Sequence, residues 1–179
     1  MFELKNKVMF LAIIGVIAVA VWVWVGWRKA PYSKLPEGVK VDSLVVLKSA
    51  RTMMAYAQGK HVRTYYIALG QQPIGHKEVE GDMKTPEGIY SINDRNPNSA
   101  YHKNLGISYP NDADLAHAQS LGKSAGGDIK IHGLKNGMGS IGRLHRQQDW
   151  THGCIAVTNE EMDELYESVE IGATIVLMP

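Results

Sequence analysis

Hydrophobic and polar positions divide the chain into three stretches. Residues 8–27 form an apolar run without a charged side chain. Residues 29–42 mix charges with two prolines and show no apolar period, which is typical of a linker. From residue 43 to residue 179, short β-type runs alternate with turn residues. This pattern predicts one folded domain of the α+β class, mostly β with two short helices.

Eight segments of this domain carry the β-branched, aromatic and aliphatic residues that are typical of strands. The expected strands are 44–49, 52–57, 61–69, 88–93, 105–110, 128–133, 154–157 and 173–179. The turn residues 58–60 between the second and third strands predict a hairpin. We therefore expect a sheet to be the main element of the fold.

Two other segments have the spacing of helices. Asn111 is a suitable N-cap for a helix that ends near Gly122, a residue type common just after a helix C-terminus. Thr158 and Glu161 have capping-box spacing at the start of the second helix. Neither helix carries residues that suggest chemistry, so both are expected to be structural.

The N-terminal apolar run has the length of a membrane-spanning helix. A helix that rises 1.5 Å per residue needs about 20 residues to cross ~30 Å of hydrocarbon. We expect residues 1–28 to be an uncleaved anchor with its helix at 8–27. A cleavable signal peptide is the alternative, because residues 18–20 read Ala-Val-Ala, but cleavage there would leave an exposed apolar tail. The flanking charges are nearly balanced and do not set the orientation.

Composition limits the partners of the chain and the roles of its cysteine. The chain has 179 residues, a formal net charge of +1 and no long basic block, so nucleic acid is not an expected partner. It contains one cysteine, Cys154, which cannot form an internal disulfide. That thiol is therefore a buried apolar residue, a metal ligand or a nucleophile.

The neighbours of Cys154 favour the nucleophile. Thr151 and His152 are polar, and Gly153 precedes the thiol directly. A glycine there lets the backbone turn tightly, so that successive N–H groups can point at a reacting carbonyl oxygen. Core positions seldom have such neighbours.

A cysteine nucleophile also needs a base, because a thiol with a pKa of about 8.5 is largely protonated at neutral pH. His132 is the first candidate, since it ends an expected strand and Gly133 follows it. His145 and His152 are the alternatives. The chain has no C-x-x-C motif, which disfavours a thiol oxidoreductase.

These residues lie within a longer motif, and the motif resembles a known family. Residues 131–159 read IHGLKNGMGSIGRLHRQQDWTHGCIAVTN, which is similar to the signature of the L,D-transpeptidase (YkuD-like) catalytic domain: an HG pair, a variable loop and [S/T]-x-G-C. Upstream, GDMKTPEGIYSI at 81–92 and ISYPN at 107–111 also resemble family segments. The resemblance spans residues 44–179.

The resemblance implies a β-sandwich catalytic domain that acts on peptidoglycan stem peptides without a cofactor or a metal. Cys154 would attack the bond after the L-centre of meso-diaminopimelate and hold the acyl group as a thioester. His132 would be the general base and acid. An amine would then accept the acyl group and give a cross-link or an attached protein, or water would hydrolyse the thioester and trim the stem. A related hydrolase, an L,D-carboxypeptidase or an amidase that removes crosslinked partners, would form the same thioester. The residues expected to shape the site and to stabilise the oxyanion are Gly133, Thr151, His152 and Gly153. The resemblance implies that four backbone N–H groups, those of Thr151, His152, Gly153 and Cys154, bind the oxyanion.

Two departures from the family pattern affect the expected substrate contacts. Ala156 stands where many members have an arginine, and the loop between His132 and Cys154 is longer than usual. Arg143 in that loop is a possible replacement for the arginine. The residues expected to contact substrate are Arg143, His145, Trp150 and Tyr109.

Two other functions are compatible with the same residues. The side chains of His132, His145, His152 and Cys154 could ligate zinc in a peptidase, although no H-E-x-x-H helix is present. The domain could also be a non-catalytic module that binds the cell wall. If the substrate is peptidoglycan, we expect a single-pass protein of the inner membrane, in contact with that membrane through residues 8–27, with its catalytic domain in the periplasm.

Overall fold

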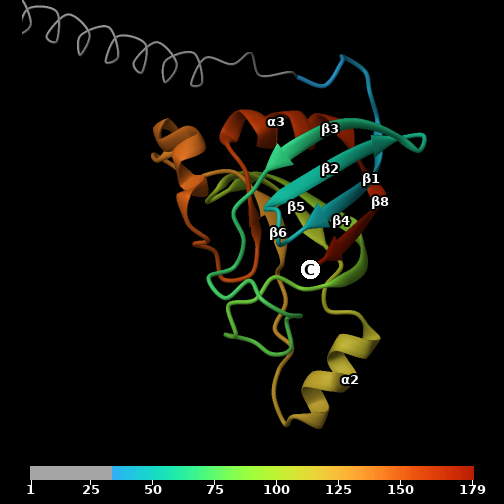
Figure 1. Cartoon of the computed structure of the whole chain (residues 1–179), viewed down its shortest axis with the longest axis vertical. Coiled ribbons are helices and arrows are strands. Elements are labelled where there is room, and N and C mark those ends of the chain that lie inside the picture. Colours follow the sequence, from blue (N-terminus) through green and yellow to red (C-terminus); the bar gives the residue numbers. More distant parts are fainter. Residues whose placement is uncertain (1–33) are drawn as a thin grey trace, which may run out of the picture. The chain divides into compact units, whose positions relative to one another are not determined.

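The computed structural model describes residues 34–179, and an eight-stranded mixed sheet dominates it (Figure 1). The strands follow the order β3-β2-β1-β8-β4-β5-β6-β7. The pairs β1–β8 and β6–β7 are parallel, and the other neighbours are antiparallel. The strand bounds are β1 Val41–Leu47, β2 Thr52–Ala57, β3 Lys60–Tyr66, β4 Gly88–Ser99, β5 His102–Ile107, β6 Lys130–His132, β7 Ile155–Ala156 and β8 Val169–Met178.

Strand β4 joins two halves of the sheet. It is 12 residues long, and its first part pairs with β8 while the remainder pairs with β5. The two layers expected of a sandwich are therefore halves of one sheet. Ala68, just after the edge strand β3, forms an antiparallel bridge with Ala156 in β7. The chain that follows one edge strand therefore lies beside the other edge strand.

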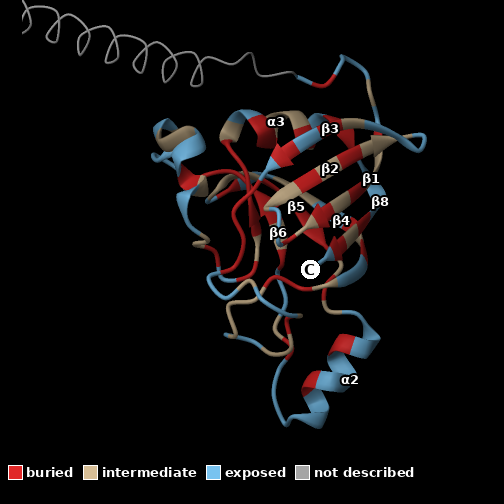
Figure 2. Cartoon of the chain, viewed as in Figure 1, coloured by how far each residue is buried: buried red, intermediate tan, exposed pale blue. Residues whose placement is uncertain are grey.

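Residues 35–179 form one compact unit whose inner strand faces share one core (Figure 2). Alternate residues are buried along much of β1, β3 and β8, as the period of two in a strand requires, whereas β5 buries four consecutive residues at its end. Both halves of the sheet and the second of the expected helices contribute to this core. Its fully buried members include Leu44, Met53, Tyr65, Ile92, Leu105, Ile131, Ile155, Met162, Leu165 and Ile175.

The structure confirms both expected helices and adds a third. Helix α2 (Asp112–Ser120) begins after Asn111, whose side chain accepts hydrogen bonds from two backbone N–H groups, at 2.9 and 3.0 Å. Helix α3 (Asn159–Ser168) has the expected capping box of Thr158 and Glu161. A 3-10 helix, η1 (Gly139–Gln147), occupies the segment expected to be a loop. Its turns are interrupted at Gly142, which has a positive φ of 50°.

The N-terminal expectations lie largely outside the described residues. This applies to the anchor helix expected at 8–27 and to the first part of the linker expected at 29–42. Within residues 34–179, no helix has both the length and the hydropathy needed to cross a bilayer. Strand β1 begins at Val41, two residues before the expected start of the folded domain.

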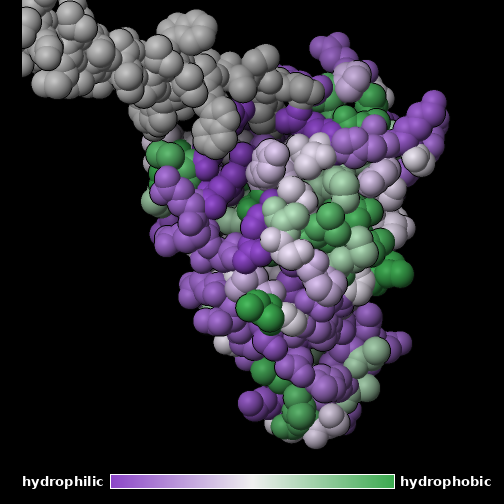
Figure 3. Space-filling model, in the orientation of Figure 1, coloured by the Kyte–Doolittle hydropathy of each residue, from purple (hydrophilic) through white to green (hydrophobic). Residues whose placement is uncertain are grey.

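The other face of the first half of the sheet is partly apolar. Met54, Val45, Val176 and Ile89 lie in register across β2, β1, β8 and β4. Figure 3 shows hydrophobic residues gathered over these strands, whereas the surface around α2 is mainly hydrophilic. Chemistry-bearing residues are concentrated instead on the outer face of the second half of the sheet.

Candidate active site

The parallel pairing of β6 with β7 places His132 and Cys154 on one face of the sheet. Ile131 pairs with Ile155 and His132 pairs with Ala156, while Cys154 lies immediately before β7. Since side chains alternate along a strand, Cys154 shares a face with His132. The isoleucines point the other way, into the core. The thiol and the imidazole therefore lie on neighbouring strands, two positions apart in register.

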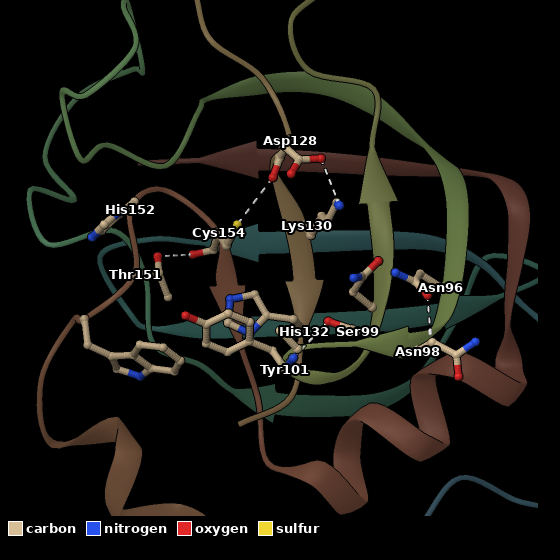
Figure 4. Close-up of a pocket in the computed structure, with 13 residues that line it drawn as sticks. Asn96, Asn98, Ser99, Tyr101, Asp128, Lys130, His132, Thr151, His152 and Cys154 are labelled. Atoms are coloured by element: carbon tan, nitrogen blue, oxygen red, sulfur yellow. Dashed lines mark hydrogen bonds and ion pairs between the residues drawn. The ribbon is translucent and has the colours of Figure 1, made fainter. Parts of the chain in front are cut away.

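A cavity of about 370 Å³ lies on this face. Figure 4 shows the Cys154 sulfur on the strand next to Lys130 and His132, with Asn96 and Asn98 beyond them. The lining is aromatic on one side of the thiol, at Tyr101 and Trp150, and polar or charged elsewhere. The lining residues are Asn96, Asn98, Ser99, Ala100, Tyr101, Asn104, Asp128, Lys130, His132, Trp150, Thr151, His152 and Cys154.

The surroundings of Cys154 favour the protonated thiol. Its Sγ donates a hydrogen bond to the backbone carbonyl of Asp128, at 3.6 Å. Burial raises the pKa of the thiol above its ordinary value. This effect outweighs those of the backbone N–H and the positive charge of Lys130, both of which lower the thiol pKa. Attack on a carbonyl therefore requires a base that removes this proton.

His132 has the protonation state that a base needs. It is 6% exposed, and burial lowers its pKa, with the charge of Lys130 acting in the same direction. The Nδ1–H donates a 2.7 Å hydrogen bond to the carbonyl of Gly133. In the neutral ring this leaves the lone pair on Nε2. His132 packs against the rings of Tyr101 and Trp150, with centroids 4.8 and 5.6 Å away.

Glycine is required beside each of these two residues. A Cβ on Gly133 would come within 2.8 Å of Asn159 Oδ1 and 3.0 Å of His102 Cβ. Gly153 has a φ of 129°, and a Cβ there would lie 2.6 Å from the carbonyl oxygen of Lys84. Both close approaches fix the backbone next to His132 and Cys154.

The turn before Cys154 is held by a threonine. Thr151 Oγ1 donates to the carbonyl of Cys154 at 2.7 Å and accepts from the N–H of Gly153 at 3.1 Å. The backbone N–H of Thr151 donates to the backbone carbonyl of Leu69, at 3.1 Å. Two of the four N–H groups expected to bind an oxyanion are therefore already engaged, and the expectation narrows to those of His152 and Cys154. The His152 side chain is exposed and points away from the thiol (Figure 4).

An ion pair anchors the segment that leads into this turn. Asp149 accepts hydrogen bonds from Arg51 Nε and Nη2, the shorter at 2.8 Å, and from the N–H of Leu69 at 2.9 Å. Arg51 lies in the turn between β1 and β2. The first half of the sheet thus holds the chain just before Trp150.

The four residues expected to contact substrate lie in different places. Trp150 lines the cavity, and its indole N–H faces Nδ1 of the buried His145 at 3.5 Å. Burial lowers the pKa of His145 to about 4. Arg143 is exposed on η1 and is not part of the cavity lining. Tyr109 belongs to the core, where its hydroxyl donates to the carbonyl of Ala125 at 3.1 Å. Of the four, the structure brings only Trp150 to the cavity.

Sequence reasoning missed several residues of the cavity. Lys130 could have been found from the pattern, because it lies two positions before His132 on the same strand. Asn96, Tyr101 and Asn104 come from β4, β5 and the turn between them, and only the pairing of β5 with β6 brings this hairpin to the site. No local signal in the sequence indicates that contact.

The zinc alternative gains no geometric support. Among residues 34–179, no three His, Cys, Asp or Glu side chains form a group that could hold a metal ion. His145 lies behind Trp150, and the exposed His152 side chain points away from the thiol. The four expected ligands therefore do not converge.

Comparison with known proteins agrees with the family resemblance of the sequence motif. The model of the L,D-transpeptidase catalytic domain family, YkuD, matches residues 41–178. The chain is 32% identical over 130 residues to YafK of Escherichia coli strain K12, which carries a provisional L,D-transpeptidase name; the match covers 69% of this chain and 45% of YafK. Among solved structures, it is similar to the helical cell shape determining protein Pgp2 of Campylobacter jejuni, with a TM-score of 0.57 and 28% identity over 81% of this chain and 50% of Pgp2.

A second solved structure shares the fold. Bd1075 of Bdellovibrio bacteriovorus has a TM-score of 0.54 and 23% identity, over 80% of this chain and 49% of Bd1075. The chain therefore matches about half the length of these relatives.

Proposed function

The chain belongs to the L,D-transpeptidase catalytic domain family, and from this premise we propose that it is a cysteine acyltransferase that acts on peptidoglycan stem peptides. One observation carries the proposal. Cys154 and His132 share a face of adjacent parallel strands, and the bond from Nδ1 to Gly133 leaves Nε2 of the imidazole able to accept a proton.

The first half-reaction forms a thioester. Nε2 of His132 takes the proton from the Cys154 thiol as sulfur attacks the carbonyl carbon of the L-centre of diaminopimelate. The tetrahedral intermediate then collapses, the C–N bond breaks, and the imidazolium returns the proton to the leaving amine of D-alanine. Because both groups start neutral, proton transfer accompanies the attack rather than preceding it.

The backbone at the turn stabilises the negative oxygen of this intermediate. We assign that role to the N–H groups of His152 and Cys154, because those of Thr151 and Gly153 already have acceptors. Thr151 and Gly153 contribute by fixing the turn.

The second half-reaction releases the acyl group. An amine of another stem peptide attacks the thioester and forms a cross-link, or water attacks and leaves a trimmed stem; either route restores the thiol. Both outcomes alter the wall on which cell shape depends, which is compatible with the similarity to the cell shape determining protein Pgp2. We place the reaction in the periplasm, with residues 8–27 as the anchor in the inner membrane.

The test is the release of D-alanine from a disaccharide tetrapeptide by the purified full-length chain. We expect release by the wild type and none by Cys154→Ala, with mass spectrometry of the products distinguishing cross-linked from trimmed stems. Release that persists in Cys154→Ala and stops with a chelator would instead establish the zinc peptidase. The periplasmic location is tested separately with C-terminal reporters, and a reporter active only in the cytoplasm would contradict it.

A further inference from the structure

Two charged residues next to the thiol have no role in the reaction described above. Lys130 lies in β6 on the same face as His132, in the register position beside Cys154. Asp128 lies two residues earlier, and its backbone carbonyl accepts the thiol hydrogen bond. Lys130 Nζ and Asp128 Oδ1 form an ion pair at 2.8 Å (Figure 4). A positive and a negative group therefore line the cavity within reach of the reacting sulfur.

The exposure of this pair suits ligand binding better than a purely structural role. The side chain of Asp128 is 85% exposed and that of Lys130 is 26% exposed. An exposed ion pair contributes little to stability, so stability alone does not explain the pair. Both charges remain accessible from the cavity. A ligand that carries one positive and one negative group could pair with Asp128 and Lys130 in place of their mutual ion pair, so that no charge is left unpaired.

A buried amide oxygen in the same cavity also lacks a partner within the described part of the chain. Asn104 is 4% exposed and lines the cavity, and its Oδ1 accepts no hydrogen bond within the described part of the chain. It pairs with His132 across β5 and β6, so its side chain lies on the face that carries the catalytic pair. A buried acceptor without a donor is unfavourable, and a bound molecule that offers an N–H group would satisfy it.

We propose that Lys130 and Asp128 form a specificity subsite for a zwitterionic amino acid group on the substrate side chain, with Asn104 accepting an N–H group of the bound stem. Lys130 binds the carboxylate of the group and Asp128 binds its ammonium. The D-centre of meso-diaminopimelate is such a group, and a short methylene chain joins it to the L-centre whose carbonyl Cys154 attacks. The inference rests on the proposed function and adds the residues that select the stem.

The subsite predicts discrimination between stems. An L-lysine stem keeps the ammonium but lacks the carboxylate, so it leaves Lys130 without its partner. A meso-diaminopimelate stem whose D-centre carboxylate is amidated has the same defect. Removing one charge-assisted hydrogen bond from a partly buried site lowers kcat/KM by about tenfold or more.

The experiment measures kcat/KM of the full-length chain for the meso-diaminopimelate, amidated and L-lysine tetrapeptides. The variants are Lys130→Met, which keeps a side chain of similar length without the charge, and Lys123→Met, a control at an exposed lysine outside the cavity. The readout is the ratio of kcat/KM between stems. This ratio cancels any change in the pKa of the thiol, to which Lys130 also contributes.

We expect the wild type and Lys123→Met to prefer the meso-diaminopimelate stem by about tenfold or more, and Lys130→Met to lose this preference. The inference is overturned if the wild type cleaves the three stems equally, or if Lys130→Met keeps the preference. A wild type that cleaves none of the stems contradicts the proposed function, and the inference with it.

Discussion

At the scale of single residues, the surroundings of the proposed nucleophile Cys154 and of the proposed base His132 both favour the neutral form, in contrast to a thiolate–imidazolium pair. Burial raises the pKa of Cys154 and lowers that of His132, so each shift favours the uncharged form. A preformed ion pair would require the opposite shifts. In the proposed reaction we therefore expect proton transfer from Cys154 to His132 to accompany attack on the carbonyl.

The first prediction concerns the thiol without substrate. The rate of alkylation of Cys154 by iodoacetamide should stay low at neutral pH and rise only above about pH 8.5, because the thiol pKa lies above its ordinary value. Alkylation followed by mass spectrometry across pH 5–10 provides the measurement. A plateau of fast alkylation between pH 5 and pH 7 would indicate an ion pair and contradict this description.

The second prediction concerns His145. Its pKa is about 4 in the folded state, against about 6.5 in an unfolded chain. Because the unfolded chain binds this proton more tightly, protonation of His145 favours unfolding. The stability that the neutral, buried ring contributes is complete above pH 6.5 and is lost as the pH falls toward 4, to a total of about 3 kcal/mol. The Tm of His145→Gln should fall less steeply than that of the wild type over this interval. Equal slopes would show that His145 titrates normally.

At the scale of elements, the sequence predicts structure best where the signal is local. All eight strands of the described domain overlap the segments expected from β-type runs, and both helices follow from their capping residues. The bounds differ where pairing extends a strand: β4 continues to Ser99, beyond its expected end at residue 93, and β5 begins at His102 rather than at residue 105. Helix η1 was missed because it is a polar 3-10 segment interrupted at Gly142. The motif suggests Cys154 and His132 as the proposed catalytic pair, but their geometry depends on the β6–β7 register, which is set by contacts distant in sequence. Asn104 could not be predicted for the same reason, because the β5–β6 pairing that brings it to the site also joins segments distant in sequence.

The third prediction tests the tether between the two halves of the sheet. Asp149→Asn keeps the shape of the side chain but removes the charge that holds Arg51. We expect a loss of about 1–2 kcal/mol in the free energy of unfolding, since the Arg51 side chain is 39% exposed and partly screened, together with a lower kcat/KM. Urea unfolding and stem cleavage provide the measurements.

The control for this tether is Asp163→Asn. Asp163 pairs with His102 and Lys103 but its side chain is 48% exposed, so the substitution should cost less than about 1 kcal/mol. Equal effects of the two substitutions would mean that the Asp149 tether has no special role.

The fourth prediction tests the turn before Cys154. Gly153→Ala should lower the free energy of unfolding by about 3 kcal/mol or more and abolish most activity, because the new Cβ would lie 2.6 Å from the Lys84 carbonyl. Gly172→Ala is the matched control, since Gly172 also has a positive φ, 91°, but open space around it. It should cost about 1–2 kcal/mol and leave activity intact. If both variants behave alike, the contact with Lys84 does not constrain the turn.

At the scale of the whole described domain, the two faces of the sheet have separate tasks. The inner faces of both halves supply one core, which holds β6 and β7 in register. The outer face of the second half carries the thiol, the imidazole and the charged pair. Substitutions on that outer face should therefore alter chemistry more than folding, whereas substitutions at core positions such as Ile131 and Ile155 should affect both.

The central claim is that Cys154 is acylated with the help of His132, and carbapenem labelling followed by intact-mass spectrometry tests it most directly. Wild-type full-length chain should gain the mass of one carbapenem, mapped to Cys154, and Cys154→Ala should gain none. His132→Ala should be labelled about 10²–10⁴-fold more slowly and recover as the pH rises, because hydroxide can replace the missing base. His145→Ala should be labelled at close to the wild-type rate. Folded wild-type protein that remains unlabelled, or a defect in His145→Ala as deep as that of His132→Ala, would contradict the account.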